Sequence, residues 1–291
     1  MDDPRTLLQR YDLWPRKSLG QNFLVEPTAP ARIVDCADVT SEDTVLEVGA
    51  GLGTLTAALA ERAGRVIAVE TDSQLVDVLH AELDHLDNVE IVPGDIMELA
   101  PAALLSADGT PSSTGPDLWG KIDPRYHVVA NLPYYITNPV VRHLLEAEIR
   151  PVRMVITVQR EVAQRMTAEP GDMSLLSVSV QFYGKPEICM RLGRGAFYPV
   201  PRVDSAVVRI DLYETPPVAV DDVASFFRVV KAGFSQRRKQ LRNSLSAGLH
   251  LDPQVVEAAM QAHGLDHRRR AETFSVAAWG DVYAALAPLL T

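Results

Sequence analysis

Apolar residues in the first half of the chain follow two spacings in turn. Short apolar runs that end in glycine or an acidic residue predict buried strands at 44–51, 65–70 and 89–95. Apolar residues one helical turn apart predict helices at 31–39, 54–64 and 73–83. This alternation predicts βαβ units, and therefore a mainly parallel sheet wrapped by helices.

The sheet pattern resumes after a segment rich in Gly, Pro, Ser and Thr at 106–120, which we expect to be a surface loop without chemistry. Further strands are predicted at 126–131, 153–159, 177–184, 187–193 and 205–213. The short connections between the last three favour an antiparallel addition at one sheet edge. Pro216-Pro217 marks a boundary, so we expect one domain over 1–215 and a helical domain over 216–291.

Composition supports a folded cytoplasmic protein. The 291 residues are 47% hydrophobic, enough for one large core and one small one. The N-terminus lacks the apolar run of a secretory signal, and no stretch of the chain is long and apolar enough to span a membrane. Cys36 and Cys189 have the spacing of neither a zinc cluster nor a disulfide framework, so we expect buried thiols and no metal.

Charge is distributed unevenly along the chain. The net charge of -10 argues against indiscriminate binding to nucleic acid. A basic run without acidic residues nevertheless occupies 226–250, and a second cluster follows at 267–270. Such a run is more often a solvated helix face than an RNA-binding surface, and both interpretations stay open on this feature alone.

The residues that close the predicted parallel strands indicate a ligand, because ligands bind at the carboxyl ends of such strands. The first strand runs into Gly49, Gly51 and Gly53, where bare backbone can approach a ligand. Glu70 closes the second strand at the separation from Gly49 that suits hydrogen bonds to ribose hydroxyls. Asp95, which follows the third strand, could accept a hydrogen bond from the amino group of an adenine, or it could cap a helix at 96–100. Together these residues predict an adenosine-containing cofactor.

The fourth strand ends in an unusual junction. Asn131 can both donate and accept hydrogen bonds, and Pro133 forces Leu132 toward an extended conformation and lacks a backbone donor. The turn therefore presents carbonyl oxygens, which suit an amino group, and Tyr134 suits a planar partner. This combination indicates methylation of an amine on a flat base. Tyr135 has no assigned chemistry, and we expect it to pack.

These residues resemble the adenine N6-methylating branch of the S-adenosylmethionine-dependent methyltransferases, whose Asn-Leu-Pro-Tyr motif is present at 131–134. More closely, the chain is similar to the small-subunit (16S) ribosomal RNA adenine N6,N6-dimethyltransferases. Four further segments carry this resemblance: 17–24, 47–56, 197–207 and 234–245. One departure is Met173-Ser174, where the family often has Tyr-Gly.

The resemblance implies a Rossmann-like class I methyltransferase sheet, mostly parallel with an antiparallel edge, followed by a small all-helical domain. It also implies S-adenosylmethionine as cofactor, with S-adenosylhomocysteine as product, and a cytoplasmic monomer that acts on small-subunit rRNA in immature small ribosomal subunits. The implied cofactor-binding residues are Gln21, Asn22, Leu24, Gly49, Gly51, Glu70, Asp95 and Asn131. The implied RNA-binding residues are Arg237, Arg238, Lys239 and Arg242.

The reaction implied is methyl transfer to N6 of two adjacent adenosines in a 3'-terminal hairpin loop. Asn131 and the Leu132 carbonyl would accept the amino hydrogens, Pro133 would set the turn, and Tyr134 and Phe197 would stack on the base. Two alternatives remain: a large-subunit rRNA adenine dimethyltransferase of the antibiotic-resistance type, and a mainly non-catalytic ribosome assembly factor. A methyltransferase of a different amine, such as a protein glutamine side chain or a DNA adenine, is a further alternative; against the protein enzyme, Leu132 replaces the first proline of its usual motif.

Overall fold

The computed structural model describes residues 1–106 and 125–290, so most of the loop predicted at 106–120 lies outside the described residues. The chain forms two compact units. Unit 1 comprises Met1–Ala163 and Pro186–Glu214, and unit 2 comprises Gln164–Lys185 and Thr215–Thr291. The expected boundary at 215/216 therefore lies one residue from a break between units, but unit 2 also includes a segment inserted before the last strands.

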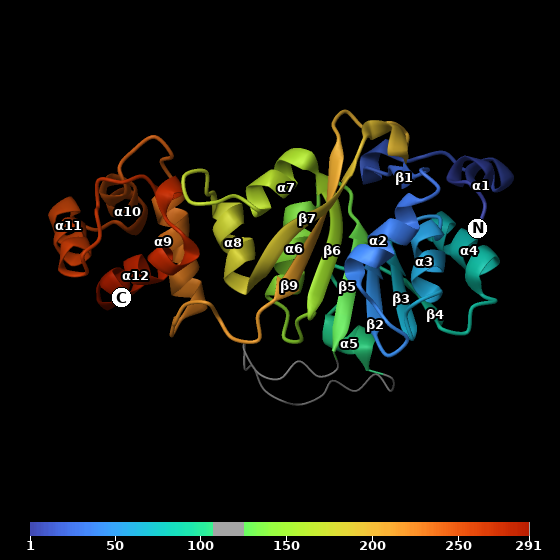
Figure 1. The fold of residues 1–291 in the computed structure, drawn as a ribbon, viewed down its shortest axis with the longest axis horizontal. Helices are drawn as coiled ribbons and strands as arrows, with labels where there is room; N and C mark the ends of the chain where they lie inside the picture. The colour runs from blue at the N-terminus through green and yellow to red at the C-terminus, as the bar shows by residue number, and fades with distance from the viewer. Residues whose placement is uncertain (107–124, 291) are drawn as a thin grey trace. The chain divides into compact units, whose positions relative to one another are not determined.

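Unit 1 contains a seven-stranded sheet with the order β4-β3-β2-β5-β6-β9-β7 (Figure 1). Its strands are β2 (Thr44–Val48), β3 (Arg65–Glu70), β4 (Val89–Pro93), β5 (Tyr126–Asn131), β6 (Arg153–Gln159), β7 (Gly184–Leu192) and β9 (Ser205–Leu212). The pairs from β4 to β6 are parallel, and β9 runs antiparallel to β6. The mostly parallel sheet with an antiparallel edge is thus confirmed.

The central strands are buried because their side chains are apolar on both faces, as a parallel sheet covered by helices requires. On one face, apolar side chains of α2 and α3 pack against Val45, Val66, Val129 and Val155. The helices that begin in unit 1 are α1 (Pro4–Arg10), α2 (Ala29–Ala37), α3 (Thr54–Ala60), α4 (Ser73–Leu83), α5 (Pro101–Leu105), α6 (Thr137–Leu145) and α7 (Arg160–Met166), with the 3-10 turns η1 (Lys17–Leu19) and η2 (Arg194–Ala196).

A second, two-stranded sheet joins distant parts of unit 1. In it, β1 (Phe23–Leu24) pairs antiparallel with β8 (Phe197–Tyr198), with Leu24 opposite Phe197. The pairing continues where Val25 N–H donates to the main-chain oxygen of Ala196 over 2.8 Å. This ribbon places the N-terminal motif beside the motif that begins at Phe197.

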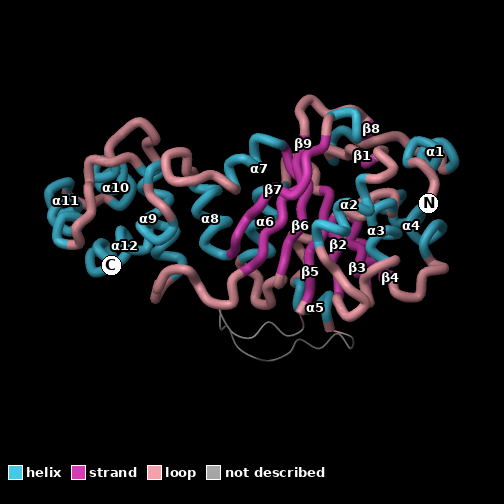
Figure 2. The backbone as a smooth tube through the Cα atoms, viewed as in Figure 1, coloured by secondary structure: helices cyan, strands magenta, loops and turns pink. Residues whose placement is uncertain are grey.

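Unit 2 is helical apart from the first residues of β7 (Figure 2). Its helices are α8 (Leu175–Tyr183), α9 (Val223–Phe234), α10 (Leu241–Leu249), α11 (Pro253–Ala262) and α12 (Val276–Leu286), with η3 (Ala271–Thr273) and η4 (Ala287–Leu289). The prediction of helices beyond residue 218 is confirmed.

The strand predicted at 177–184 is wrong, because this segment forms α8. Its Ser-Val-Ser-Val alternation mimics a strand, but Ser174 and Ser177 form a capping box that starts a helix. The buried ring of Phe182 then stacks on Phe226 of α9, with centroids 4.8 Å apart. Helix capping and packing within unit 2 therefore override the local pattern.

Candidate active site

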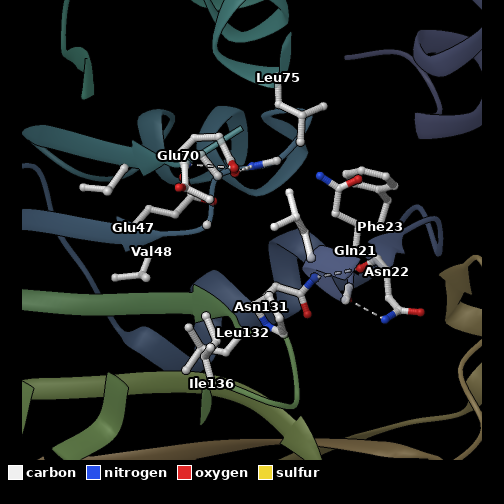
Figure 3. A pocket seen from close by; sticks show the side chains of 18 of the residues that line it. Gln21, Asn22, Phe23, Glu47, Val48, Glu70, Leu75, Asn131, Leu132 and Ile136 are labelled. Carbon is white, nitrogen blue, oxygen red and sulfur yellow. Dashed lines mark hydrogen bonds between the residues drawn. The ribbon is translucent and has the colours of Figure 1, made fainter. Parts of the chain in front are cut away.

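A pocket lies at the carboxyl ends of β2, β3, β4 and β5, where the sequence predicts ligand binding. Segments at the ends of these strands line it together with residues around β1 (Figure 3). Residues 19–24 and Phe197 of β8 belong to the same lining. All of these segments belong to unit 1. The structure thus brings together every residue predicted for cofactor or adenine binding.

The glycine-rich loop after β2 presents main chain to the pocket. Gly49 has φ of 76° and Gly51 has φ of 62°, values that favour glycine. A Cβ atom added at Gly49 would meet nothing within 4 Å, so a side chain there would occupy open pocket space. The loop therefore leaves a cradle of bare backbone that fits a ligand lying flat against it.

Glu70 organises the ends of β2 and β3. One oxygen of its carboxylate accepts from Gly51 N–H at 2.8 Å, and the other accepts from the N–H groups of Thr71 and Asp72, each at 2.9 Å. Burial raises the pKa of Glu70, and these backbone donors oppose that rise. Since an ionised carboxylate offers about four acceptor positions, one remains for a ligand hydroxyl.

Asp95 follows β4 at the pocket edge. Its Oδ1 accepts from Met97 N–H at 2.9 Å, so the carboxylate closes a turn and keeps an exposed oxygen for a ligand. The helix considered at 96–100 is not formed: these residues are in turns, and α5 begins at Pro101. The capping alternative for Asp95 is therefore wrong as stated.

The N-terminal motif covers the pocket in an unexpected way. The Gln21 side chain lines the pocket, but its Oε1 accepts from Arg16 N–H at 2.7 Å and its Nε2 donates to Asp72 at 2.9 Å. Arg16 also pairs with Asp72 at 2.9 Å. Gln21 thus holds the N-terminal arm against the start of α4, and Asp72 is the partner that Gln21 and Arg16 share.

Asn131 is oriented by the same N-terminal motif (Figure 3). Its Nδ2 donates to the main-chain oxygen of Asn22 at 3.2 Å, and Asn22 in turn donates from Nδ2 to the oxygen of Gly20 at 2.8 Å. Because the donor end of the Asn131 amide is occupied, its Oδ1 is the end left to accept. No hydrogen bond to that oxygen, or to the Leu132 carbonyl, is found within residues 1–106 and 125–290.

The turn after Asn131 is closed by its own main chain. The Pro133 oxygen accepts from Ile136 N–H at 3.1 Å and from the Thr137 hydroxyl at 3.3 Å. Tyr134 is half-buried, and its phenol oxygen lies 2.6 Å from Ser205 Oγ. The ring of Tyr134 is therefore anchored at its far end to the first residue of β9.

Phe197 lines the same pocket but is only 1% exposed. It packs in the apolar cluster that contains Leu24, Ile33 and Met190, and its place opposite Leu24 in the β1–β8 ribbon fixes its backbone. The structure thus brings Phe197 and Tyr134 to one pocket. The Phe197 ring is too buried to offer an open face for stacking.

Glu47 is a pocket residue that the sequence analysis did not single out. It is 1% exposed, and its Oε2 has no hydrogen-bond partner among the described residues. Burial raises the pKa of Glu47 to about 8, and the negative charge of Glu70 acts in the same direction. Its position as the last polar residue before the glycine loop is the only sequence signal that could have marked it.

The predicted RNA-binding residues lie in unit 2. Arg237, Arg238 and Lys239 are exposed in the turn between α9 and α10, whereas Arg242 is half-buried and forms an ion pair with Glu257 of α11. The main chain joins this turn to the second basic cluster, because Leu241 N–H donates to the oxygen of Arg269 at 2.7 Å. The two basic clusters therefore lie side by side.

Within residues 1–106 and 125–290, no group of three or more His, Cys, Asp or Glu side chains has a geometry that could hold a metal ion. None of the helices described has both the length and the apolar character needed to cross a membrane.

Comparison with known proteins supports one family. A family model described as ribosomal RNA adenine dimethylase matches residues 14–287. The ribosomal RNA small subunit methyltransferase A of Dehalococcoides mccartyi (strain ATCC BAA-2266 / KCTC 15142 / 195) is 43% identical over 279 residues, which cover 96% of this chain and 91% of the relative. The ribosomal RNA small subunit methyltransferase A of Geobacillus kaustophilus is 40% identical over 291 residues, which cover 98% of this chain and 95% of that relative.

Solved structures share the fold. The 23S rRNA methyltransferase ErmE matches with a TM-score of 0.69 and 26% identity, covering 91% of this chain and 100% of that one. A dimethyladenosine transferase from Plasmodium falciparum matches with a TM-score of 0.70 and 22% identity, covering 91% and 98%, which supports the fold alone. With the family model and the relatives above, these findings establish that the chain belongs to the ribosomal RNA adenine dimethylase family and is an rRNA adenine dimethyltransferase.

Proposed function

We propose that this protein transfers methyl groups from S-adenosylmethionine to N6 of two adjacent adenosines in a 3'-terminal hairpin loop of 16S rRNA, giving N6,N6-dimethyladenosine. The observation that carries the proposal is the junction at Asn131, where an oriented amide oxygen and a free main-chain carbonyl face a pocket that aromatic rings also line. The relatives at 40–43% identity, all named for the small subunit, support the choice of RNA.

The pocket fits S-adenosylmethionine. The bare backbone at Gly49 and Gly51 suits close approach by a ligand, the remaining acceptor position of Glu70 suits a ribose hydroxyl, and the exposed Asp95 oxygen suits an adenine amino group. Leu24 and Asn22 close the pocket from the N-terminal side, and Gln21 holds that segment in place. When bound, the cofactor supplies an electrophilic methyl group.

The chemistry assigned to the protein concerns the target amine. The lone pair of adenine N6 is delocalised into the ring, so it is a weak nucleophile. Asn131 Oδ1 and the Leu132 carbonyl accept hydrogen bonds from the two N–H groups of adenine N6. These bonds favour a pyramidal nitrogen and stabilise the positive charge that develops on it. Holding the amine in one orientation supplies a further part of the rate enhancement. No strong base is required, because the proton leaves to solvent after transfer.

Tyr134 and Phe197 hold the adenine that has been taken out of its RNA structure. Base stacking on an aromatic ring contributes about 1–3 kcal/mol per base. The hydrogen bond between the hydroxyls of Tyr134 and Ser205 fixes one ring, and the β1–β8 ribbon fixes the backbone of the other. Since Phe197 is deeply embedded, we expect it to contribute the wall of the pocket more than an open face.

The basic clusters of unit 2 would bind the RNA backbone. Arg237, Arg238 and Lys239 are exposed, and their phosphate contacts would supply affinity without reading sequence. Arg242 is half-buried beside Glu257, so we assign it to positioning the turn rather than to direct contact. We propose further that the protein acts as a cytoplasmic monomer on immature small subunits.

Incubation with tritiated S-adenosylmethionine and small-subunit particles that lack the modification tests the proposal. Label in N6,N6-dimethyladenine of 16S rRNA is expected. Label that appears only in large-subunit RNA would instead support the function of the solved 23S rRNA methyltransferase, and particle binding without label would support an assembly factor.

A further inference from the structure

The rim of the pocket carries an aromatic ring that the proposed reaction does not use. Tyr135 lines the pocket, yet it is 60% exposed. The prediction that Tyr135 packs in the protein is therefore wrong. After the turn at Pro133, Tyr134 points toward Ser205 and the next ring is left at the surface.

The ring of Tyr135 is nevertheless held in place. A Cβ atom built on Gly20 would lie 3.1 Å from both Cδ1 and Cε1 of Tyr135 and 3.3 Å from Cβ of Pro133. One side of the ring therefore faces Gly20, where φ is 61° and where even a Cβ atom would be held unusually tightly against the ring. A glycine at this position lets the loop carry the ring without covering its exposed part.

The support beneath the ring is tied to the catalytic amide. The oxygen of Gly20 accepts from Asn22, and the oxygen of Asn22 accepts from Asn131. Gly20 N–H also donates to the oxygen of Lys17 at 3.1 Å, which closes the η1 turn. Lys17 is exposed and forms none of the ion pairs within the described residues, so the η1 turn that ends at Gly20 carries a positive charge without an ion-pair partner there.

Exposed aromatic rings are rare in the part of the chain that the structure describes. Among the described residues, Tyr135 and Trp14 are the two aromatic side chains in the set of exposed large hydrophobic residues, and Trp14 does not line the pocket. An exposed, supported ring on a loop whose neighbouring turn carries a basic residue is typical of sites that bind unpaired bases, where stacking supplies affinity and a basic residue meets the phosphate.

We propose that Tyr135 and Gly20, with Lys17, form a second nucleotide subsite, which stacks the base adjacent to the target adenosine. This inference rests on the proposed function and deepens it. Tyr134 and Tyr135 are consecutive, so their Cα atoms are about 3.8 Å apart. Two consecutive nucleotides can therefore be held by two consecutive residues, one base inside the pocket and its neighbour on the rim.

The test compares methyl transfer by Tyr135→Ala, Tyr135→Leu and Tyr135→Phe on small-subunit particles that lack the modification. Loss of one base stack predicts that kcat/KM for particles falls about 5- to 150-fold in the Ala and Leu variants. The Leu variant keeps apolar contact with Gly20 but has no ring, whereas the Phe variant keeps the ring and stays within about twofold of wild type. Trp14→Ala is the matched control and leaves kcat/KM unchanged.

Two further measurements separate stacking from a structural role. The Kd for S-adenosylmethionine is the same in all four variants as in wild type. Particles are also reconstituted with two RNAs, one lacking the base on the 5' side of the target adenosine and one lacking the base on its 3' side. With one of these two RNAs, Tyr135→Ala no longer lowers kcat/KM. Equal activity of the Ala variant and wild type on intact particles, or the same loss on both base-deleted RNAs, would overturn the inference; absence of transfer by wild type would instead refute the proposed function.

Discussion

The phenol oxygen of Tyr134 and the hydroxyl of Ser205 lie 2.6 Å apart, so the turn after β5 is bonded to the first residue of β9. β9 runs antiparallel to β6, which is itself the parallel neighbour of β5. The ring that we assign to the base is thus fixed across the antiparallel edge of the sheet before any RNA binds. Such fixing lowers the entropy that must be lost when the base is bound.

Removing the ring and removing only its hydroxyl should have different effects. Tyr134→Phe keeps the stacking surface and loses one hydrogen bond, so we expect a loss of about 0.5–1.5 kcal/mol in unfolding free energy and less than about tenfold in kcat/KM. Tyr134→Ala removes the stack as well, and kcat/KM falls by about a further 5- to 150-fold. Steady-state methylation of particles measures both, and equal activity of the two variants would contradict the stacking role.

The unusual ionisation of Glu47 predicts a pH-dependent stability. Its pKa is raised from about 4.5 when unfolded to about 8 when folded, so between these values the folded state binds the extra proton. The free energy of unfolding therefore falls as pH rises through this window and loses no more from Glu47 above pH 8. Glu47→Gln has no ionisable group at this position, so it lacks this decrease in unfolding free energy with rising pH.

Denaturant unfolding of wild type and Glu47→Gln at pH 5.5 and pH 8 checks this prediction. At each pH, the unfolding free energy of wild type is subtracted from that of the variant. This difference should be about 2–3 kcal/mol more positive at pH 8 than at pH 5.5. Glu42→Gln, at an exposed position just before β2, is the control and should show no such difference. A pH-independent difference for Glu47→Gln would mean that the folded carboxyl titrates normally.

Asp72 should control cofactor binding from outside the glycine loop. Its carboxylate bonds Arg16 and Gln21 and also caps α4 by accepting from Gln74 N–H at 3.2 Å. Asp72→Ala frees the N-terminal arm, so we expect the Kd for S-adenosylmethionine to rise about tenfold while kcat at saturation changes little. Asp84→Ala, at the other end of α4, is the control for loss of an acidic side chain. An unchanged Kd in Asp72→Ala would show that the arm does not shape the pocket.

The exposed basic turn of unit 2 should act on RNA affinity alone. Replacing Arg237, Arg238 and Lys239 together with Ala should weaken particle binding and reduce the dependence of log K on log salt by about 2–3 units of slope. Binding of S-adenosylmethionine should not change, because the pocket belongs to unit 1. The matched control replaces three exposed arginines of unit 1: Arg32, Arg62 and Arg142. An equal loss in the control would mean that total charge, not this turn, sets affinity.

The sequence predicted the part of the site that local chemistry encodes. Each parallel strand ends in a residue whose type is informative, and Glu70 and Asn131 both reached the pocket for that reason. The parallel pairing of the strands from β4 to β6 also followed from their alternation with helices. Pairing of β1 with β8 had no local signal, because it depends on segments far apart in the chain.

Local sequence patterns did not predict features that depend on tertiary contacts. The segment at 177–184 alternates like a strand, but Ser174 caps a helix and Phe182 packs on Phe226. Gln21 lines the pocket, but no local signal indicated that its amide also bonds Arg16 and Asp72. The exposure of Tyr135 also could not be predicted, since it depends on a turn and on Gly20 beneath the ring.

The most direct test of the account is the nucleoside digest of 16S rRNA after incubation of modification-free particles with wild type or Asn131→Ala. Removing one oriented polar group from such a site lowers kcat by about 10²–10³. We expect N6,N6-dimethyladenosine with wild type and none above background with Asn131→Ala, while the variant folds and its Kd for particles matches wild type. Wild-type yield of dimethyladenosine from Asn131→Ala would contradict the account.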